Sequence, residues 1–327
     1  MEFIRQHGRS GIKASILGMG CWAIGGPFWR GETPLGWGEV DDDESIRAIH
    51  CALDLGVNFF DTADVYGAGH SERVLGRAFD GCREDVVIAT KFSNIFDETA
   101  RQVTGASAEP AHIRQACEAS LRRLKTDYLD LYQFHDNGYP AEKAEPVRET
   151  LEDLVKEGKI RAYGWSTDFA GSAEVFAQGK NCAAVQLQLN VLDDNPAVIK
   201  VCEEYNLAAI CRGPLAMGLL TGKYTLNSKP SSDDVRGENS PEWMTYFKDG
   251  KPSSEWLQKM EAIRETLTSG GRTLAQGALA WLWARSDQTL PVPGFRTVAQ
   301  VEENCGALQY GPLSDAQMQE IDALMGR

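Results

Sequence analysis

Short apolar runs alternate with amphipathic stretches along the whole chain. Eight runs predict β-strands, at residues 16–20, 57–60, 86–89, 129–134, 162–165, 184–188, 208–211 and 289–292. Several are apolar throughout instead of alternating, which is typical of parallel strands covered by helices. A hairpin is expected before them, over residues 2–15. The pattern therefore indicates an α/β protein with a parallel sheet.

The stretches between these runs predict helices with recognisable start and stop signals. Asp43 is expected to cap a helix that stops at Gly56, and Pro110 and Pro196 suit the first turns of two others. Further helices are expected over 149–157, 255–267 and 273–285, with a long polar loop at 221–254. Eight βα units in about 300 residues favour a closed (β/α)8 TIM barrel over a doubly wound sheet. We expect one domain over residues 1–327.

The stretch SILGMGCWAIGG contains Gly18-x-Gly20-x-x-Ala23, the spacing of a dinucleotide-binding fingerprint. Such a fingerprint requires a helix directly after the glycines, with its N-terminus facing the pyrophosphate. Here Gly25-Gly26-Pro27 follows and breaks any helix. The acidic residues about 20 positions further on precede a helix instead of ending a strand. The sequence therefore disfavours a Rossmann crevice at this place.

Charge and cysteine usage restrict the possible partners. The net charge of -14 argues against nucleic acid and anionic membranes, and an anionic cofactor would need a few local cations. The eight cysteines show neither C-x-x-C pairs nor metal-ligand spacing, so we expect reduced thiols and no metal site. The N-terminus has no apolar signal region, and no apolar run reaches membrane-spanning length. These features predict a cytoplasmic protein.

Polar side chains follow three consecutive predicted strands. Asp61 and Tyr66 come after the second strand, Lys91 after the third and His135 after the fourth. The carboxyl ends of barrel strands meet at one rim, where catalytic groups lie. A lysine ammonium lowers the pKa of a nearby phenol from about 10, and an aspartate can hold that lysine in place. The set suits a general acid that protonates an alkoxide, with the histidine orienting a carbonyl.

Each of these residues also has a simpler interpretation. Asp61 and Lys91 could form a structural salt bridge across the barrel mouth. His135 could be a core histidine, and Tyr66 could pin a loop. A barrel hydrolase that uses Asp61 and Asp64 as paired carboxylates is a further hypothesis, but it leaves Tyr66, Lys91 and His135 without a joint role.

The motif Asp61-Thr62-Ala63-x-x-Tyr66-Gly67, followed by Ser71-Glu72, Lys91 and His135, resembles the aldo-keto reductase superfamily. The similarity runs from GRSGIKASILGMG to PGFRTVAQVEEN, almost the whole chain. It implies a (β/α)8 barrel that binds NADP(H) without a Rossmann fold, with a catalytic tetrad of Asp61, Tyr66, Lys91 and His135. The implied reaction is reduction of an aldehyde, ketone, sugar or other cyclic carbonyl, with Tyr66 as the acid.

A binding module similar to the potassium-channel β subunits shares this fold and stays open as an alternative. No channel partner can be inferred from the sequence. The implied partner is a small-molecule carbonyl or alcohol, and the sequence does not indicate an oligomeric state.

The resemblance also implies cofactor contacts after the later strands. Ser166 and Gln186 match the residues that hold the nicotinamide carboxamide, and Thr167 stands where asparagine is common. Arg212 replaces an aromatic ring that stacks on the nicotinamide, and a guanidinium can also stack on a ring face. The loop expected to cover the pyrophosphate contributes Gly213, Leu215, Gly218, Leu219 and Lys223.

The segment VPGFRTVAQVEEN corresponds to the part of the family that grips the adenosine 2′-phosphate and the adenine. Its implied contact residues are Gly294, Phe295, Arg296, Gln300, Glu303 and Asn304. The guanidinium of Arg296 gives charge-assisted hydrogen bonds to phosphate, which favours NADP over NAD.

Aromatic residues are frequent in two of the predicted loops. We expect them to line a substrate pocket, because small-molecule sites combine apolar walls with few polar groups. They are Trp22, Phe28, Trp29 and Trp37 with Arg30 in the first loop, and Trp243, Tyr246 and Phe247 in the long loop. Trp281 and Trp283 lie on a predicted helix and are expected in the core.

Overall fold

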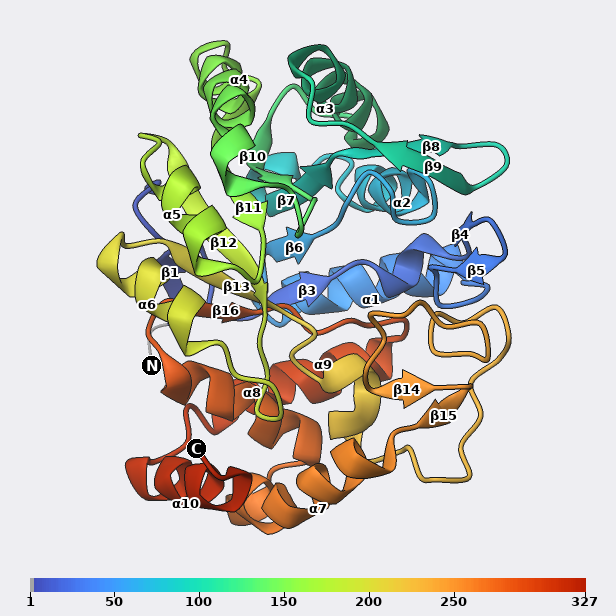
Figure 1. The fold of residues 1–327 in the computed structure, drawn as a ribbon, viewed down its shortest axis with the longest axis vertical. Coiled ribbons are helices and arrows are strands. Elements are labelled where there is room, and N and C mark those ends of the chain that lie inside the picture. The colour runs from blue at the N-terminus through green and yellow to red at the C-terminus, as the bar shows by residue number, and fades with distance from the viewer. Residues whose placement is uncertain (1–2) are drawn as a thin grey trace.

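The structure, a computed structural model, describes residues 3–327 and has an eight-stranded parallel sheet at its centre (Figure 1). The strand order is β16-β13-β12-β11-β10-β7-β6-β3. The bounds are β3 (Gly18–Gly20), β6 (Phe59–Asp61), β7 (Val87–Phe92), β10 (Leu129–Phe134), β11 (Ile160–Ser166), β12 (Cys182–Gln188), β13 (Ala208–Arg212) and β16 (Thr289–Pro291). Each corresponds to one of the predicted strands, with ends that differ by a few residues.

The first and last strands meet at a seam that nearly closes the sheet into a barrel. Gly20 forms a parallel bridge with Gly294, and its N–H donates to the carbonyl of Pro293 at 2.9 Å. The indole nitrogen of Trp283 donates to the carbonyl of Ile16 at 3.0 Å, which ties the chain before β3 to α8. The predicted TIM barrel is therefore confirmed.

The strands are surrounded by helices (Figure 1). Their bounds are α1 (Asp42–Asp54), α2 (His70–Ala78), α3 (Pro110–Leu124), α4 (Glu145–Lys156), α5 (Ala170–Ala177), α6 (Pro196–Glu204), α7 (Ser254–Thr268), α8 (Leu274–Arg285), α9 (Val298–Gly306) and α10 (Asp315–Met325). The predicted cap Asp43 is wrong. The side chain of Asp41 accepts from the N–H of Glu44 instead, because three successive aspartates offer three possible caps and only one has extended backbone at this position.

The predicted N-terminal hairpin closes one end of the barrel. It consists of β1 (Ile4–Gln6) and β2 (Lys13–Ser15), and its expected start at residue 2 lies outside the described residues. Ile12 and Ala14 pack with Phe59 and other side chains inside the barrel. Burial of this apolar surface stabilises the closed end. A ligand site must therefore open at the opposite end, where the strands terminate.

Loops and small sheets build that opposite end. The predicted long loop lies after η4 (Ala216–Thr221), and within it β14 (Phe247–Lys248) pairs with β15 (Lys251–Pro252). A second sheet joins β4 (Trp29–Arg30), β5 (Thr33–Pro34), β8 (Asn94–Asp97) and β9 (Gln102–Ala106), which the sequence did not predict.

The long loop is attached to the loop after β3. Trp37 forms an antiparallel bridge with Asp234, and Val235 N–H donates to the carbonyl of Gly36 at 2.7 Å. The Arg236 guanidinium lies 4.4 Å from the ring centre of Trp37 and pairs with Asp234. Between Phe3 and Arg327, no helix is both long and apolar enough to cross a membrane.

Candidate active site

The side chains predicted from the strand ends lie together at the open end of the barrel. The Lys91 ammonium donates to Asp61 Oδ2 at 2.7 Å, to the carbonyl of Thr62 at 2.7 Å and to the Tyr66 hydroxyl at 3.3 Å. The rings of Tyr66 and His135 lie 6.0 Å apart, nearly perpendicular at 87°. One lysine thus links the carboxylate and the phenol, and the imidazole faces the phenol ring.

A close approach of two backbone segments positions Tyr66. The turn η1 (Ala23–Gly25) packs directly against the Tyr66–Gly67 peptide. A Cβ on Gly67, whose φ is +61°, would lie 1.8 Å from the carbonyl of Gly25, and one on Gly25 would lie 2.9 Å from the backbone of Tyr66. Only glycine fits at both places. Ser71 strengthens the contact by donating its hydroxyl to the carbonyl of Cys21 at 2.8 Å.

Two glutamines complete the surroundings of Asp61. Its Oδ1 accepts from Gln133 Nε2 at 3.1 Å and from Gln186 Nε2 at 2.7 Å. Gln133 lies beside Lys91 in the register of β10 and β7. The sequence prediction missed Gln133, although a glutamine two positions before His135 on a mostly apolar strand was a visible signal. Asp61 is therefore fixed by donors on both of its oxygens.

The charges of the site keep each group in a defined protonation state. Burial lowers the pKa of Lys91, but Asp61 and Tyr66 together raise it above its ordinary 10.5. Burial raises the pKa of Tyr66 above 10, and the Lys91 charge only partly offsets this. Lys91 thus lowers the Tyr66 pKa as expected, but burial, which the sequence prediction did not include, outweighs it. Burial, with the charges of Lys91 and Arg212, holds the pKa of His135 well below 6.5. At neutral pH the set is a charged lysine, a protonated phenol and a neutral imidazole.

The paired-carboxylate hypothesis does not fit this geometry. Both oxygens of Asp61 are occupied by the lysine and the two glutamines. Asp64 is buried, and burial together with the charge of Glu72 raises its pKa well above 3.8. A hydrolase needs one carboxylate free to act on substrate or water. Asp61 is not free in this way, so it does not form a catalytic carboxylate pair with Asp64.

The residues implied for the nicotinamide lie at the ends of the next strands. Ser166 ends β11 and is paired in register with Gln186 of β12. The N–H of the buried Thr167 donates to the carbonyl of Gln186 at 2.8 Å. Arg212 ends β13, forms an ion pair with Asp168 and donates to Gln188 Oε1 at 3.1 Å. These contacts hold its guanidinium at the rim.

The loop implied for the pyrophosphate has an unusual backbone. Gly213 has a φ of +62°, and three successive residues are also left-handed: Ala216 at +48°, Met217 at +55° and Gly218 at +94°. Such conformations are costly for residues other than glycine and cluster at ligand sites. The side chains of Leu215 and Leu219 are buried, so these residues can offer a ligand only backbone groups.

Cations gather beside this loop. Lys223 lies near Arg236 and Arg296, and burial together with these two charges lowers its pKa below 10.5. Arg296 donates to the carbonyl of Trp37 at 2.9 Å and to that of Glu39, so it joins the segment after β16 to the loop after β3. Sequence reasoning missed Arg236, which also donates to the carbonyl of Met217 at 3.1 Å.

The other residues that the resemblance implies as adenosine contacts stabilise the loop after β16. Gln300 accepts from the N–H of Arg296 at 2.7 Å, and Asn304 donates to the carbonyl of Gly294 at 3.5 Å. The Glu303 carbonyl accepts from Gln276, and Phe295 is buried.

Aromatic side chains border the tetrad on one side. Trp22 stacks on Tyr66, with ring centres 5.8 Å apart, and contacts Trp37 at 5.2 Å and Trp243 at 6.2 Å. Trp243 is about half exposed. Three expected pocket residues are instead in the interior: Phe28, Tyr246 and Phe247. The loops that carry them pack against other loops, which loop composition alone does not reveal. Trp281 and Trp283 are buried on α8, as predicted.

A model of the Aldo/keto reductase family matches residues 17–325. The chain belongs to this family. Aldo-keto reductase yakc of Schizosaccharomyces pombe, whose name specifies NADP(+), is 32% identical over 314 residues, which cover 93% of this chain and 86% of that protein.

Solved structures agree with the assignment. Glycerol dehydrogenase AKR11B4 from Gluconobacter oxydans is 31% identical, with a TM-score of 0.80 and coverage of 99% of this chain and 95% of that one. An aldo/keto reductase from Klebsiella pneumoniae, in complex with NADP and acetate, is 25% identical, with a TM-score of 0.69 and coverage of 99% and 96%. The family predicted from the tetrad motif is confirmed.

The structure of this aldo/keto reductase fits a phosphate-bearing nicotinamide coenzyme. The left-handed turn at Ala216–Gly218 and the nearby cations Lys223 and Arg296 provide donors and charge that suit phosphate groups. His135 Nδ1 is buried and lacks a hydrogen-bond partner among the described residues, so one polar atom of the mouth is left for a ligand or water.

Proposed function

We propose that this protein is an NADPH-dependent carbonyl reductase in which Tyr66 is the general acid. The observation that carries the proposal is the single lysine that hydrogen-bonds both Asp61 and the Tyr66 hydroxyl in a buried site. A buried, fixed cation beside a phenol is suited to stabilise the phenolate that remains after proton donation.

Residues around the barrel mouth would hold the coenzyme. Ser166, Thr167 and Gln186 would contact the nicotinamide, and the guanidinium of Arg212 would stack on its ring. The loop from Gly213 to Lys223 would hold the pyrophosphate, and the segment from Gly294 to Asn304 would hold the 2′-phosphate through Arg296. When bound, NADPH supplies the hydride that is added to the carbonyl carbon.

Side chains of the protein hold the proton and donate it to the substrate. Tyr66 keeps its proton at neutral pH, since the ordinary pKa of a phenol is about 10 and burial raises it further. Its hydroxyl can therefore hydrogen-bond a carbonyl oxygen before the reaction. As negative charge develops on that oxygen, Tyr66 donates the proton and Lys91 stabilises the phenolate. Neutral His135 offers one ring nitrogen as a second donor that orients the carbonyl. Asp61 holds Lys91 in position.

The aromatic border favours substrates with an apolar face. Trp22, Trp37 and Trp243 can cover an aromatic ring or the apolar side of a sugar next to the carbonyl. We therefore expect aldehydes, ketones or cyclic carbonyls that present a flat apolar surface.

Replacing Tyr66 by phenylalanine tests the proposal, since it removes only the hydroxyl. We expect the turnover number with saturating NADPH to fall by about 10²- to 10⁴-fold, the contribution typical of general acid catalysis. NADPH affinity, measured by fluorescence titration, and the melting temperature should stay unchanged. Tyr205→Phe is the matched control, because within residues 3–327 the Tyr205 hydroxyl accepts a hydrogen bond from the surface residue Gln178 and from no other side chain. Wild-type turnover in Tyr66→Phe contradicts the assignment of the acid.

A further inference from the structure

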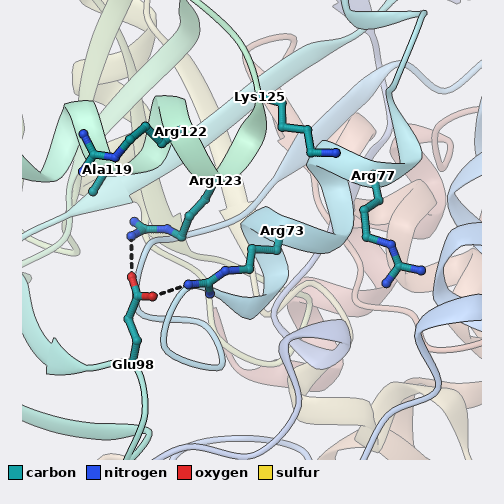
Figure 2. A pocket seen from close by; sticks show the side chains of 7 residues that line it. All are labelled: Arg73, Arg77, Glu98, Ala119, Arg122, Arg123 and Lys125. Carbon is teal, nitrogen blue, oxygen red and sulfur yellow. Dashed lines mark hydrogen bonds and ion pairs between the residues drawn. The ribbon is translucent and has the colours of Figure 1, made fainter.

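A basic pocket lies on the outside of the barrel, where α2 and α3 pack together (Figure 2). It is a cavity of about 500 Å³. Its lining is Arg73, Arg77, Glu98, Ala119, Arg122, Arg123 and Lys125. Five of these seven residues are cations, in a chain whose net charge is -14. These residues take no part in the tetrad or in the proposed coenzyme contacts.

Two arginines in the pocket already converge on one anionic group. Arg123 donates to Glu98 Oε1 at 2.9 Å, and Arg73 donates to the other oxygen of the same carboxylate. Figure 2 shows this carboxylate between the two guanidinium groups. Glu98 follows β8 in the turn to β9, and its side chain is 42% exposed. It is therefore at the surface, where another anion can replace it.

Arg123 is held in place from the interior side. Its Nε donates to Glu72 Oε2 at 2.6 Å, and the buried Glu72 accepts from the Thr90 hydroxyl at 2.6 Å. The Arg123 side chain is only 9% exposed. A guanidinium fixed in this way loses little conformational freedom when it binds an anion.

Two of the three remaining cations lack a carboxylate partner among the described residues, whereas Arg77 pairs with both Asp42 and Asp43. Within residues 3–327, neither Arg122 nor Lys125 forms an ion pair with a carboxylate. Their position at the C-terminal end of α3 is favourable for cations, which explains part of the cluster. It does not explain Lys125 itself, which has a φ of +54° at a position where glycine is preferred. Arg77 pairs with Asp42 and is about half exposed.

We propose that this pocket binds a chain of linked phosphate groups, which displaces Glu98. Arg73 and Arg123 would bind one phosphate through charge-assisted hydrogen bonds, as they now bind the carboxylate. Arg122 and Lys125, which have no carboxylate partner within residues 3–327, offer positive charge for further phosphates. An anion with a single charge would not use them. The charged donors of the lining suit phosphate oxygens, so the proposal assigns recognition to the phosphates and expects no contribution from a base or sugar.

Isothermal titration calorimetry with inorganic triphosphate and with ATP tests this inference. Both probes should bind the protein with similar Kd, and saturation with NADP⁺ should not abolish binding. Arg122→Ala/Lys125→Ala should raise the Kd by about tenfold or more, as expected for lost contacts to a multiply charged anion. Lys180→Ala/Lys200→Ala makes the same charge change elsewhere and should leave the Kd unchanged. Circular dichroism should show the same melting temperature for the wild type and both double variants.

Glu98→Gln provides a test with the opposite sign. Removing the carboxylate that competes for Arg73 and Arg123 should lower the Kd for triphosphate, whereas Asp127→Asn, an equal charge change near α3, should not. The inference is overturned if neither probe binds or if ATP binds and triphosphate does not. It is equally overturned if NADP⁺ or Arg296→Ala abolishes the binding, because the probe then occupies the coenzyme site.

Discussion

Asp61 receives hydrogen bonds from three different strands, through Lys91 of β7, Gln133 of β10 and Gln186 of β12. A carboxylate held in this way cannot rotate without breaking bonds in the barrel interior. It therefore fixes the position of the lysine ammonium relative to the Tyr66 hydroxyl. Gln133 acts through Asp61 and is a positioning residue.

Gln133→Leu should lower kcat while leaving the Kd for NADPH unchanged. A hydrogen bond to a charged group contributes about 1.5–3 kcal/mol, which corresponds to about 10- to 100-fold in rate if the whole effect falls on the transition state. Gln186→Leu should lower kcat and also weaken NADPH binding, because we place Gln186 at the nicotinamide. Gln178→Leu, on the surface, is the control. Equal kcat in Gln133→Leu and wild type contradicts the positioning role.

Arg296 is expected to set the preference for NADPH over NADH. Arg296→Ala should raise the Kd for NADPH by about tenfold or more, from the loss of about 1.5–3 kcal/mol, with little change for NADH. Arg296 also bonds the loop at Trp37 and Glu39, so the ratio of the two constants isolates the phosphate contact. Lys223→Ala should raise the Kd values for NADPH and NADH by the same factor. If the ratio of the Kd values for NADPH and NADH is the same in Arg296→Ala as in the wild type, another group binds the 2′-phosphate.

The strand ends predicted that Asp61, Tyr66, Lys91 and His135 lie together, because the carboxyl ends of parallel strands meet at one rim, and the family resemblance singled them out as a tetrad. Sequence could not predict the net shift of the Tyr66 pKa, since the burial that outweighs Lys91 depends on Trp22 and other distant segments. Gln133 was missed for a related reason. A polar residue on an apolar strand shows its partner only when the barrel has formed.

Gly18 and Gly20 illustrate how a short motif can arise from packing. A Cβ on Gly20 would lie 2.6 Å from the carbonyl of Val292, and one on Gly18 would lie 2.7 Å from the ring of Phe59. The glycines are required because β3 approaches its neighbours closely at the seam. Their fingerprint spacing is unrelated to a dinucleotide.

Gly20→Ala should therefore destabilise the barrel without removing the coenzyme site. Overpacking of this kind costs about 1–3 kcal/mol, to be measured as the free energy of unfolding in urea. Gly105→Ala in β9 is the control, because its Cβ would meet only the Ile95 side chain at 3.8 Å and Gly105 has no proposed part in coenzyme binding. Loss of NADPH binding in fully folded Gly20→Ala protein would restore the Rossmann interpretation.

The hairpin that closes the barrel makes the stability of the whole chain depend on pH. His7 Nε2 donates to the carbonyls of Ala14 and Ser15, and burial lowers the His7 pKa from 6.5 to about 4. Between these values the unfolded chain binds a proton that the folded chain does not. Stability therefore falls as the pH is lowered through this window.

Integrating this difference in bound protons shows that His7 lowers the free energy of unfolding by about 3 kcal/mol between pH 6.5 and 4. His7→Gln keeps a donor but does not titrate. Urea unfolding at several pH values should show a flatter decline in the free energy of unfolding for this variant, with both proteins losing the same amount through their carboxylates. Parallel curves for the two proteins exclude this role of His7.

The seam between β3 and β16 also determines when the protein becomes functional during synthesis. β3 leaves the ribosome early and can pair with β6. Its other edge stays unpaired until the residues near Gly294 have been synthesised, and the carbonyl of Ile16 lacks its donor until Trp283 has been synthesised. Arg296 reaches back to Trp37 and Glu39 only after that closure. A nascent chain that stops before β16 has two unpaired sheet edges and lacks the segment proposed for the 2′-phosphate. Premature termination thus yields a target for chaperones and proteases and not a partially active reductase.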